Sequence, residues 1–554
     1  MGNDPTRLLV IGLDGATFRL LDPLLAAGAM PYLASLIGGG VRRELTTVFP
    51  PVTATAWASF ATGRTPGGHG ILDFAIRDPK GGGVHPASLS DQHGATVWGE
   101  VSRAGRRVSV LNLPLGYPPE PIDGTWIAGF LTPPGRRDYA SPPDLLEAIE
   151  ARLGPYPLHA APVYTPGRGG RVLAELERIT AYKFEAAHLV QAWHPADLFF
   201  LHIWETDRLQ HELWHIWDEA HPLHDPREGA RLREGIVGYF RALDARIERL
   251  HACMPAHDIV ILSDHGFGPV EKFLHVNVWL HEQGWLTFRE ERRWKERLFG
   301  WGWTPRNLYV AAMRAGLAHW RLKGGVTGRR RIADWLDRLC LSFRDVDWGR
   351  TRAYARGYYG QIFVNLLGRE PFGSVMPEAY PEVVEEIVVG LRDLRDPESG
   401  EPVIGEVWRR EEIYSGPFLE QAPDVVFLPR TMRYKAMGVV DFPSSRVIEP
   451  VYANPGDHRM SGILIAHGRG FLRGVHADPA RIIDLAPTIL HLMDLPIPAG
   501  VEGRVLTEML VPDHARRPIR WLPASPPAVS SAPSNREEEE ERLRDLLRNL
   551  GYLG

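Results

Sequence analysis

The sequence predicts an α/β fold with a mostly parallel central sheet and helices on both faces. Five short apolar runs, each about as long as a strand, are separated by helical or loop-rich stretches. Runs that are apolar throughout are typical of strands covered on both faces in a parallel sheet. These runs are RLLVIGLDG (7–15), RVSVLNLP (107–114), DLFFLHIWETD (197–207), DIVILSDHG (258–266) and SGILIAHG (461–468). The clearest helical stretches between them are residues 173–193 and 235–254.

One segment does not fit this pattern and is predicted to be an inserted helical lid subdomain. Residues 289–338 carry thirteen Lys/Arg against five Asp/Glu, together with five tryptophans. We expect an insert over 289–340 that acts as a lid, or as a docking surface for an anionic substrate or a membrane face. A solvated helical decoration is the alternative, because surface helices commonly carry charge. The catalytic core would then comprise residues 1–288 and 341–512, with an α/β pattern that resumes after residue 351.

The C-terminal region, 513–554, is predicted to be a linker followed by an acidic helix. The stretch PASPPAVSSAPSN (523–535) has too little apolar surface to fold. The following REEEEERLRDLLRNLGYLG (536–554) is typical of a short helix that ends at Gly551. Such a helix would dock on the core or form an oligomer, and the sequence does not decide between the two.

Composition excludes several classes of protein. The net charge of −5 argues against a nucleic-acid-binding role, so no sequence-specific nucleic acid binding is expected. Two cysteines form no disulfide framework. The first residues show no signal peptide, and no apolar run reaches about 18 residues, so no transmembrane segment is expected. We therefore expect a cytoplasmic protein.

Three of the apolar runs end in an aspartate: Asp14, Asp207 and Asp264. In an open parallel sheet, ligands bind in the crevice beyond the carboxyl ends of the strands. A single aspartate at such a position is often only the start of a loop. Three of them at one edge would place negative charges close together, which is unfavourable unless a cation neutralises them.

Histidines accompany these aspartates at spacings that suit metal coordination. Asp207 and His211 are four residues apart and share a face if a helix begins there. His265 follows Asp264 directly, and His458 lies in a predicted loop before the last apolar run. Mixed His and Asp ligands suit zinc, with manganese as an alternative. Each histidine could instead be a surface or capping residue, but that interpretation is weaker for the set as a whole.

Thr53 stands at a predicted helix start in FPPVTATAWASFATG (49–63). Its side chain could be a helix N-cap, which is the common role of threonine at such a junction. Alternatively, it could be a nucleophile placed where helix-start amides stabilise an anion.

In their order along the chain, these motifs resemble the alkaline phosphatase superfamily, specifically its type I phosphodiesterase/nucleotide pyrophosphatase branch. The matching pieces are IGLDG, PPVTATAWASFATGRTPGGHGI, ETDRLQH, SDHGFG, GDHRMSGI and the late DLAPTILHLMDLPIPAGVEGRVL. The resemblance implies an alkaline-phosphatase-like fold and two divalent metal ions, usually zinc. It assigns Asp207, His211 and His458 to one metal, and Asp14, Asp264, His265 and the Thr53 oxygen to the other.

The resemblance also implies a reaction. Thr53 would attack phosphorus and form a phosphothreonine, which water would then hydrolyse. The overall reaction would cleave a phosphodiester or pyrophosphate bond of a small molecule such as a nucleotide or a lipid headgroup. The alternatives are a phosphomonoesterase or phosphotransferase on the same scaffold, or a non-catalytic metal-site binding protein. The family's phosphate-contacting Asn, three residues after the nucleophile, is Ala56 here.

Three residues outside the metal ligands are candidate substrate contacts. Trp57 could stack on a base or sugar, with core packing as the alternative. Arg356 and Asn365 are further candidates in the segment after the insert. A diester preference is expected, because a monoester carries extra charge that would need a further cation. The only nearby candidate in these motifs is Arg64, which would lie about 15 Å along the helix from Thr53.

Overall fold

The computed structural model describes residues 6–77, 83–159, 162–308, 339–439, 442–523, 541–545 and 547. A ten-stranded sheet has the order β20-β2-β19-β9-β1-β8-β5-β6-β7, with β21 beside β2. Its strands are β1 (Arg7–Leu13), β2 (Val41–Thr46), β5 (Val108–Leu113), β6 (Gly124–Ala128), β7 (Ala140–Ser141), β8 (Leu198–Ile203), β9 (His257–Leu262), β19 (Ser461–His467), β20 (Val475–His476) and β21 (Ala480–Arg481). The predicted α/β fold is confirmed.

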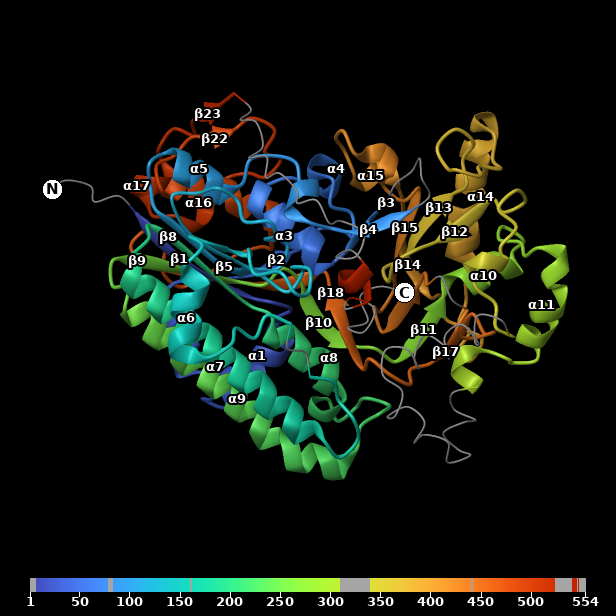
Figure 1. The fold of residues 1–554 in the computed structure, drawn as a ribbon, viewed down its shortest axis with the longest axis horizontal. Helices are drawn as coiled ribbons and strands as arrows, with labels where there is room; N and C mark the ends of the chain where they lie inside the picture. The colour runs from blue at the N-terminus through green and yellow to red at the C-terminus, as the bar shows by residue number, and fades with distance from the viewer. Residues whose placement is uncertain are drawn as a thin grey trace.

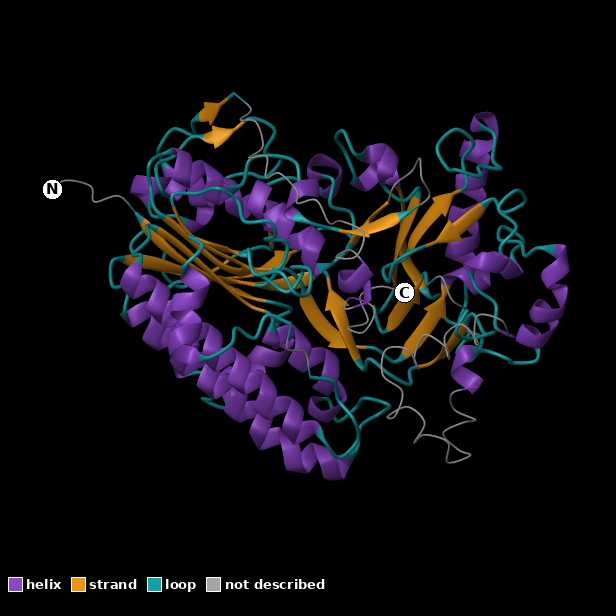
Figure 2. Cartoon of the chain, in the orientation of Figure 1, coloured by secondary structure: helices purple, strands orange, loops and turns teal. Residues whose placement is uncertain are grey.

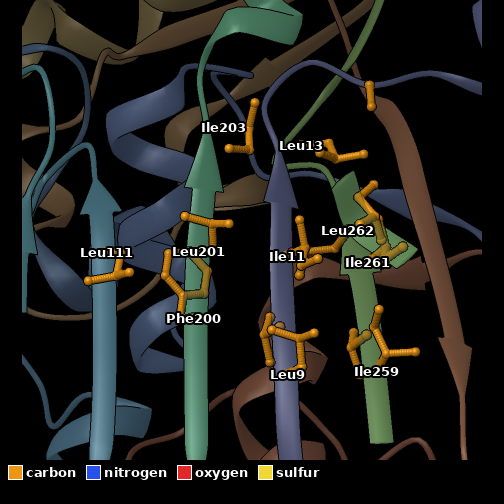
Figure 3. Close-up of a cluster of buried hydrophobic side chains, with 14 of the residues drawn as sticks. Leu9, Ile11, Leu13, Leu111, Phe200, Leu201, Ile203, Ile259, Ile261 and Leu262 are labelled. Atoms are coloured by element: carbon orange, nitrogen blue, oxygen red, sulfur yellow. The ribbon is translucent and has the colours of Figure 1, made fainter. Parts of the chain in front are cut away.

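The middle of this sheet is parallel and completely buried. β1 pairs in parallel with β8 on one side and with β9 on the other, and β8 pairs in parallel with β5. Their apolar side chains form one continuous cluster between the strands and the helices (Figure 3). The last predicted strand differs, since β19 runs antiparallel to both β9 and β2. The sheet is therefore mixed toward one edge and parallel where the aspartates end their strands.

Helices cover both faces of the sheet, as expected (Figure 1). α6 (Leu145–Leu153), α7 (Gly169–Trp193) and α9 (Pro226–Ala252) lie on one face, and α3 (Thr53–Thr62), α5 (Val97–Arg103) and α16 (Leu485–Leu492) lie on the other. α9 begins earlier than the predicted helix because Asp225 caps it, accepting from the amides of Arg227 and Glu228. α1 (Phe18–Ala26), α2 (Pro31–Gly39) and α8 (Glu205–Trp217) complete this lobe.

A second lobe has its own sheets and its own hydrophobic cluster, which runs from Leu274 to Ile448 (Figure 2). One sheet has the order β12-β13-β15-β14 and another the order β16-β11-β17. The elements are α10 (Val276–Glu282), α11 (Arg293–Gly300), α14 (Tyr380–Asp393), β11 (Lys272–His275), β12 (Ala353–Ala355), β13 (Gln361–Val364), β14 (Ile404–Arg409), β15 (Val425–Pro429), β16 (Tyr434–Met437) and β17 (Ile448–Pro450).

The strands of this lobe differ from the α/β pattern expected after residue 351. We expected the strands after residue 351 to rejoin the core, but β12–β15 form a separate antiparallel sheet. The expected lid is part of this lobe where it is described, since Phe299 of α11 is buried in the lobe's cluster. Trp294, Trp301 and Trp303 are exposed there. Residues 309–338 of the expected lid lie outside the described residues, so its role stays a prediction.

Two further findings concern the helices. Residues 541–545 and 547 are helical, within the predicted acidic helix. Among the described residues, no single helix has the length and apolar character to cross a membrane, although α1 and α2, bent by 104° at their junction, satisfy length and composition as a pair.

Candidate metal centre and nucleophile

The three strand-end aspartates meet at one edge of the sheet, because β9, β1 and β8 are neighbours. Asp14 follows β1 and Asp264 follows β9, and the amide of Gly15 donates to Asp264 Oδ1 at 3.1 Å. Asp207 lies in the first turn of α8, which begins two residues after β8 ends. All three carboxylates are completely buried.

One group of ligand atoms comprises Asp207, His211 and His458. His211 Nε2 lies 3.4 Å and His458 Nε2 3.3 Å from Asp207 Oδ1, and the two nitrogens are 3.0 Å apart. The other ring nitrogens face backbone carbonyls: His211 Nδ1 faces Gly456 at 3.0 Å and His458 Nδ1 faces Pro51 at 2.7 Å. Both Nε2 atoms are thus directed at one point. His458 lies in a short strand, β18 (Gly456–Arg459), rather than in the expected loop, and β18 pairs with β10 (Gly266–Pro269).

The other group comprises Asp14, Asp264 and His265. His265 Nε2 lies 3.5 Å from Asp14 Oδ1 and 3.3 Å from Asp264 Oδ2. His202 Nε2 and Trp57 Nε1 hold the second Asp14 oxygen at 2.8 and 3.4 Å. In a tetrahedral site with metal–ligand distances of about 2.1 Å, ligand atoms lie about 3.4 Å from one another. The separations in both groups match that value.

Thr53 joins the second group through its hydroxyl. It is the first residue of α3, and the N-cap position before it is occupied by Val52, whose side chain makes no capping hydrogen bond. Instead, Thr53 Oγ1 lies 3.4 Å from His265 Nε2 and is completely buried. The capping role considered for Thr53 is therefore wrong: its oxygen faces the ligand cluster while the first amides of α3 remain available for an anion.

The shifted pKa values of the clustered carboxyl and imidazole groups favour a bound cation. Burial raises the pKa of Asp14 well above its usual range, and the nearby carboxylates of Asp264 and Asp207 raise it further. Burial likewise raises the pKa of Asp264 to about 7. Among the described residues, Asp14 Oδ1 and Asp264 Oδ2 have no hydrogen-bond donor. Burial lowers the pKa of His265 well below its usual range, and a neutral imidazole is the form that binds a metal. The residues present therefore fit two divalent cations.

A pocket opens beside this cluster, lined by His211 and His458 together with residues that the sequence analysis missed. Asp457 groups with His211 and His458 as a further candidate ligand. Lys435 lies 3.0 Å from Asp457, and Tyr359 donates to Asp457 at 2.8 Å. Asp457 was detectable, because it directly precedes His458 in the GDHRMSGI motif. Lys435 has no such signal, since it comes from a strand of the second lobe.

The diester preference was expected because no cation was found near Thr53 in the sequence motifs. Lys435 corrects that basis, since its ammonium group lines the pocket. Its charge is already engaged: burial alone would raise the pKa of Asp457, but the Lys435 ammonium holds that pKa below its usual range. Arg208 lines the same pocket and pairs with Glu212. Arg64 is occupied elsewhere, donating to the Ala499 carbonyl at 3.3 Å.

None of the three expected substrate contacts presents a free group to a substrate at the ligand cluster. Trp57 is completely buried against Phe60, Phe200 and His202, so it has no free face for a base or sugar. The core-packing alternative describes it. Arg356 and Asn365 line a different cavity, and the Asn365 amide is taken up by the carbonyls of Trp348, Thr351 and Phe372.

Comparison with known proteins identifies the family to which the chain belongs. The family model for type I phosphodiesterase/nucleotide pyrophosphatase matches residues 8–436, a range that holds every candidate ligand except His458 and Asp457. The chain therefore belongs to the type I phosphodiesterase/nucleotide pyrophosphatase family, within the alkaline phosphatase superfamily. It is a hydrolase acting on phosphoester bonds, and its buried His and Asp clusters are consistent with the family's two-metal site.

One solved structure supports the fold, and a second is similar over most of the chain. Phosphonoacetate hydrolase from Sinorhizobium meliloti, solved with phosphonoacetate, has a TM-score of 0.52 at 16% identity, covering 88% of this chain and 96% of its own. Human ectonucleotide pyrophosphatase/phosphodiesterase 5 has a TM-score of 0.46 at 13% identity, covering 91% of this chain and 100% of its own. No curated protein sequence matches the chain.

Proposed function

We propose that the protein hydrolyses phosphodiester or pyrophosphate bonds of a small molecule through a phosphorylated Thr53. The observation that supports this most directly is the position of the Thr53 hydroxyl, 3.4 Å from His265 Nε2 at the start of a helix. An ordinary alcohol is a weak nucleophile near neutral pH. Two bound divalent metals would lower the hydroxyl pKa and neutralise phosphate charge. Zinc suits the His-rich set Asp207, His211 and His458, and manganese is the alternative.

The residues of the chain define the course of the reaction. Thr53 Oγ1 forms a bond to phosphorus while the bond from phosphorus to the leaving oxygen breaks. Water then cleaves the phosphothreonine and restores the hydroxyl. The first amides of α3 point along the helix axis and supply hydrogen bonds to the phosphoryl oxygens. A diester suits the pocket better than a monoester because the Lys435 charge is already paired with Asp457.

The test is Thr53→Ala, with Thr62→Ala as the matched control at the other end of α3. Thr62 Oγ1 donates to the Ala58 carbonyl and lies outside the ligand cluster. Thr53→Ala should lower turnover of bis-p-nitrophenyl phosphate at least about a thousand-fold with metal content unchanged. Thr62→Ala should retain activity. Acid quenching of the wild type should trap phosphate on Thr53, detectable by mass spectrometry.

Two outcomes would change the proposal. An active Thr53→Ala enzyme removes Thr53 as the nucleophile. Faster turnover of p-nitrophenyl phosphate than of the diester would favour the phosphomonoesterase alternative, with Lys435 released from Asp457 to bind the additional phosphate charge.

A further inference from the structure

A second cavity, of about 270 Å³, lies between the end of β3 (Ala75–Arg77) and the second lobe. β3 lies beside the sheet β12-β13-β15-β14 (Figure 1), where Arg77 donates to the hydroxyl of Tyr354 at 2.9 Å. The volume is close to the lower end of the range of about 300–1,000 Å³ that is typical of small-molecule sites. Among the described residues, this cavity and the pocket beside the metal centre share no lining residue. It is therefore a separate space.

Arg356 brings a positive charge into this cavity that no carboxylate of the described residues neutralises. Its Nε is buried and has no hydrogen-bond partner among them. Glu370, the one carboxylate in the described wall, is already engaged: it accepts from Arg77 at 2.6 and 2.8 Å and from the Tyr354 hydroxyl at 2.9 Å. Burial lowers the pKa of Arg356 below its usual range, yet a guanidinium stays charged in proteins. A desolvated cation of this kind favours a bound anion.

Aromatic rings flank the Arg356 guanidinium. Its Cζ lies 5.9 Å from the ring centroids of both Phe343 and Tyr354. Trp348 packs edge-to-face against these two rings, with centroid distances of 5.5 and 5.2 Å. Phe372 lines the same cavity and is nevertheless 68% exposed. A large exposed ring at the edge of a charged cavity offers a surface on which a planar ligand can stack.

We propose that this cavity binds a small aromatic anion, a planar ring that carries a carboxylate or a phosphate group. The planar fork of Arg356 matches either oxyanion through two parallel hydrogen bonds. The ring of the ligand lies against Phe372 and Trp348. None of the described residues that line the cavity is a candidate metal ligand. The site is therefore independent of the metal centre, and the inference goes beyond the proposed function.

Calorimetry on the full chain, with its metals bound, measures this site directly. The probes are phenylacetate and benzylphosphonate, which carry a ring and an oxyanion, and acetate, which lacks the ring. Arg356→Met removes the charge and keeps an unbranched side chain. Arg352→Met is the matched control, because Arg352 lies four residues earlier and pairs with Glu386 at 3.1 Å. Phe372→Ser tests the ring at an exposed position, which keeps the proposal testable if Arg356→Met does not fold.

The wild type should bind one phenylacetate per chain and bind acetate much more weakly. Arg356→Met should weaken phenylacetate binding at least about tenfold, because the paired hydrogen bonds and the charge are both lost. Phe372→Ser should weaken phenylacetate binding without changing that of acetate, and Arg352→Met should change neither. Benzylphosphonate can also bind at the metal centre, so only the part of its binding that Arg356→Met removes is assigned to the cavity. The probe that loses more affinity identifies the preferred oxyanion.

Equal binding of phenylacetate and of benzylphosphonate by the wild type and Arg356→Met overturns the site. Turnover of bis-p-nitrophenyl phosphate by Arg356→Met should equal that of the wild type. A loss of turnover in parallel with the loss of binding also overturns the separate site, because Arg356 would then act at the metal centre. A wild-type protein that binds phenylacetate through Arg356 but hydrolyses no diester contradicts the proposed function alone and leaves this inference standing.

Discussion

The role of a side chain in this protein depends on the groups that it contacts. Thr53 and Thr62 begin and end the same helix and are both buried. The Thr62 hydroxyl donates to a carbonyl of its own helix, whereas the Thr53 hydroxyl faces His265 across the ligand cluster. His69, in the same region, has Nε2 2.8 Å from Ser59 Oγ and accepts from the Ile71 amide at Nδ1, so it supports α3 structurally. Residue type alone does not separate these roles.

Glu120 gives a pH dependence that is separate from the metal centre. It is 5% exposed, and Thr96 Oγ1 lies 2.8 and 2.9 Å from its two oxygens. Burial raises its pKa from 4.5 to about 7 despite these contacts. The folded protein therefore holds this proton more tightly than the unfolded chain. Stability from this group is full below about pH 4.5 and is lost as pH rises toward 7, by about 3 kcal/mol at most.

Glu120→Gln should remove that loss, because glutamine keeps an acceptor for Thr96 and does not ionise. The thermal midpoint of the wild type minus that of the variant should fall between pH 4.5 and 7 and stay constant above. Glu147→Gln, at an exposed position of α6, is the control and should show no such change. A constant difference for Glu120→Gln across this range would contradict the buried-carboxyl account.

At the scale of elements, β1 and α3 are coupled through a single close contact. A Cβ added at Gly12 would lie 2.4 Å from Trp57 Cη2, so glycine is required for the strand to approach the ring. Trp57 Nε1 in turn points at Asp14 Oδ2, 3.4 Å away. The packing of the indole thus places Trp57 against Asp14, a candidate metal ligand two residues beyond Gly12. We expect Trp57 to position this carboxylate rather than to stack on a substrate.

Gly12→Ala should displace Trp57 and with it Asp14. We expect destabilisation of about 1–3 kcal/mol from overpacking and about tenfold weaker binding of one metal. Gly38→Ala is the matched control, because a Cβ there meets no atom within 4 Å. Thermal melting and competitive titration with a chelator measure the two effects. Unchanged metal affinity in a destabilised Gly12→Ala protein would show that Trp57 packs without positioning Asp14.

The elements also show how far the sequence could predict the structure. β1, β8 and β9 were predictable because continuous apolar runs mark strands buried on both faces, and their neighbouring positions brought the three aspartates together. The second lobe was missed because β12 and β13 are three and four residues long, too short to show a period. Lys435 was missed for another reason: its position depends on contacts between distant segments that leave no local pattern.

At the scale of the whole molecule, the candidate metal centre joins parts of the chain that are far apart. Its candidate ligands come from the ends of β1 and β9, from α8 and from β18, and the pocket beside them also includes residues of the second lobe. A metal bound at such a junction stabilises the folded chain as a whole, because the unfolded chain has no preformed site.

Removal of metal should therefore lower both activity and the thermal midpoint. With free metal at 100 times its Kd, each site contributes about 2.7 kcal/mol to stability. Elemental analysis should find about two divalent ions per chain, and a chelator should remove them and lower the midpoint by several degrees. Adding back zinc or manganese separately identifies the metal that restores activity. A purified, active protein without bound metal would contradict the two-metal site.

The place of β1 in the sheet constrains how the protein is made. β1 is synthesised well before its two neighbours, β8 and β9, which begin at Leu198 and His257. Until they are synthesised, both edges of an apolar strand stay unpaired and prone to aggregation. His458 emerges later still, so neither folding of the sheet nor full metal loading can finish on a nascent chain that ends before it. β1 therefore stays without its sheet partners until β9 has been synthesised.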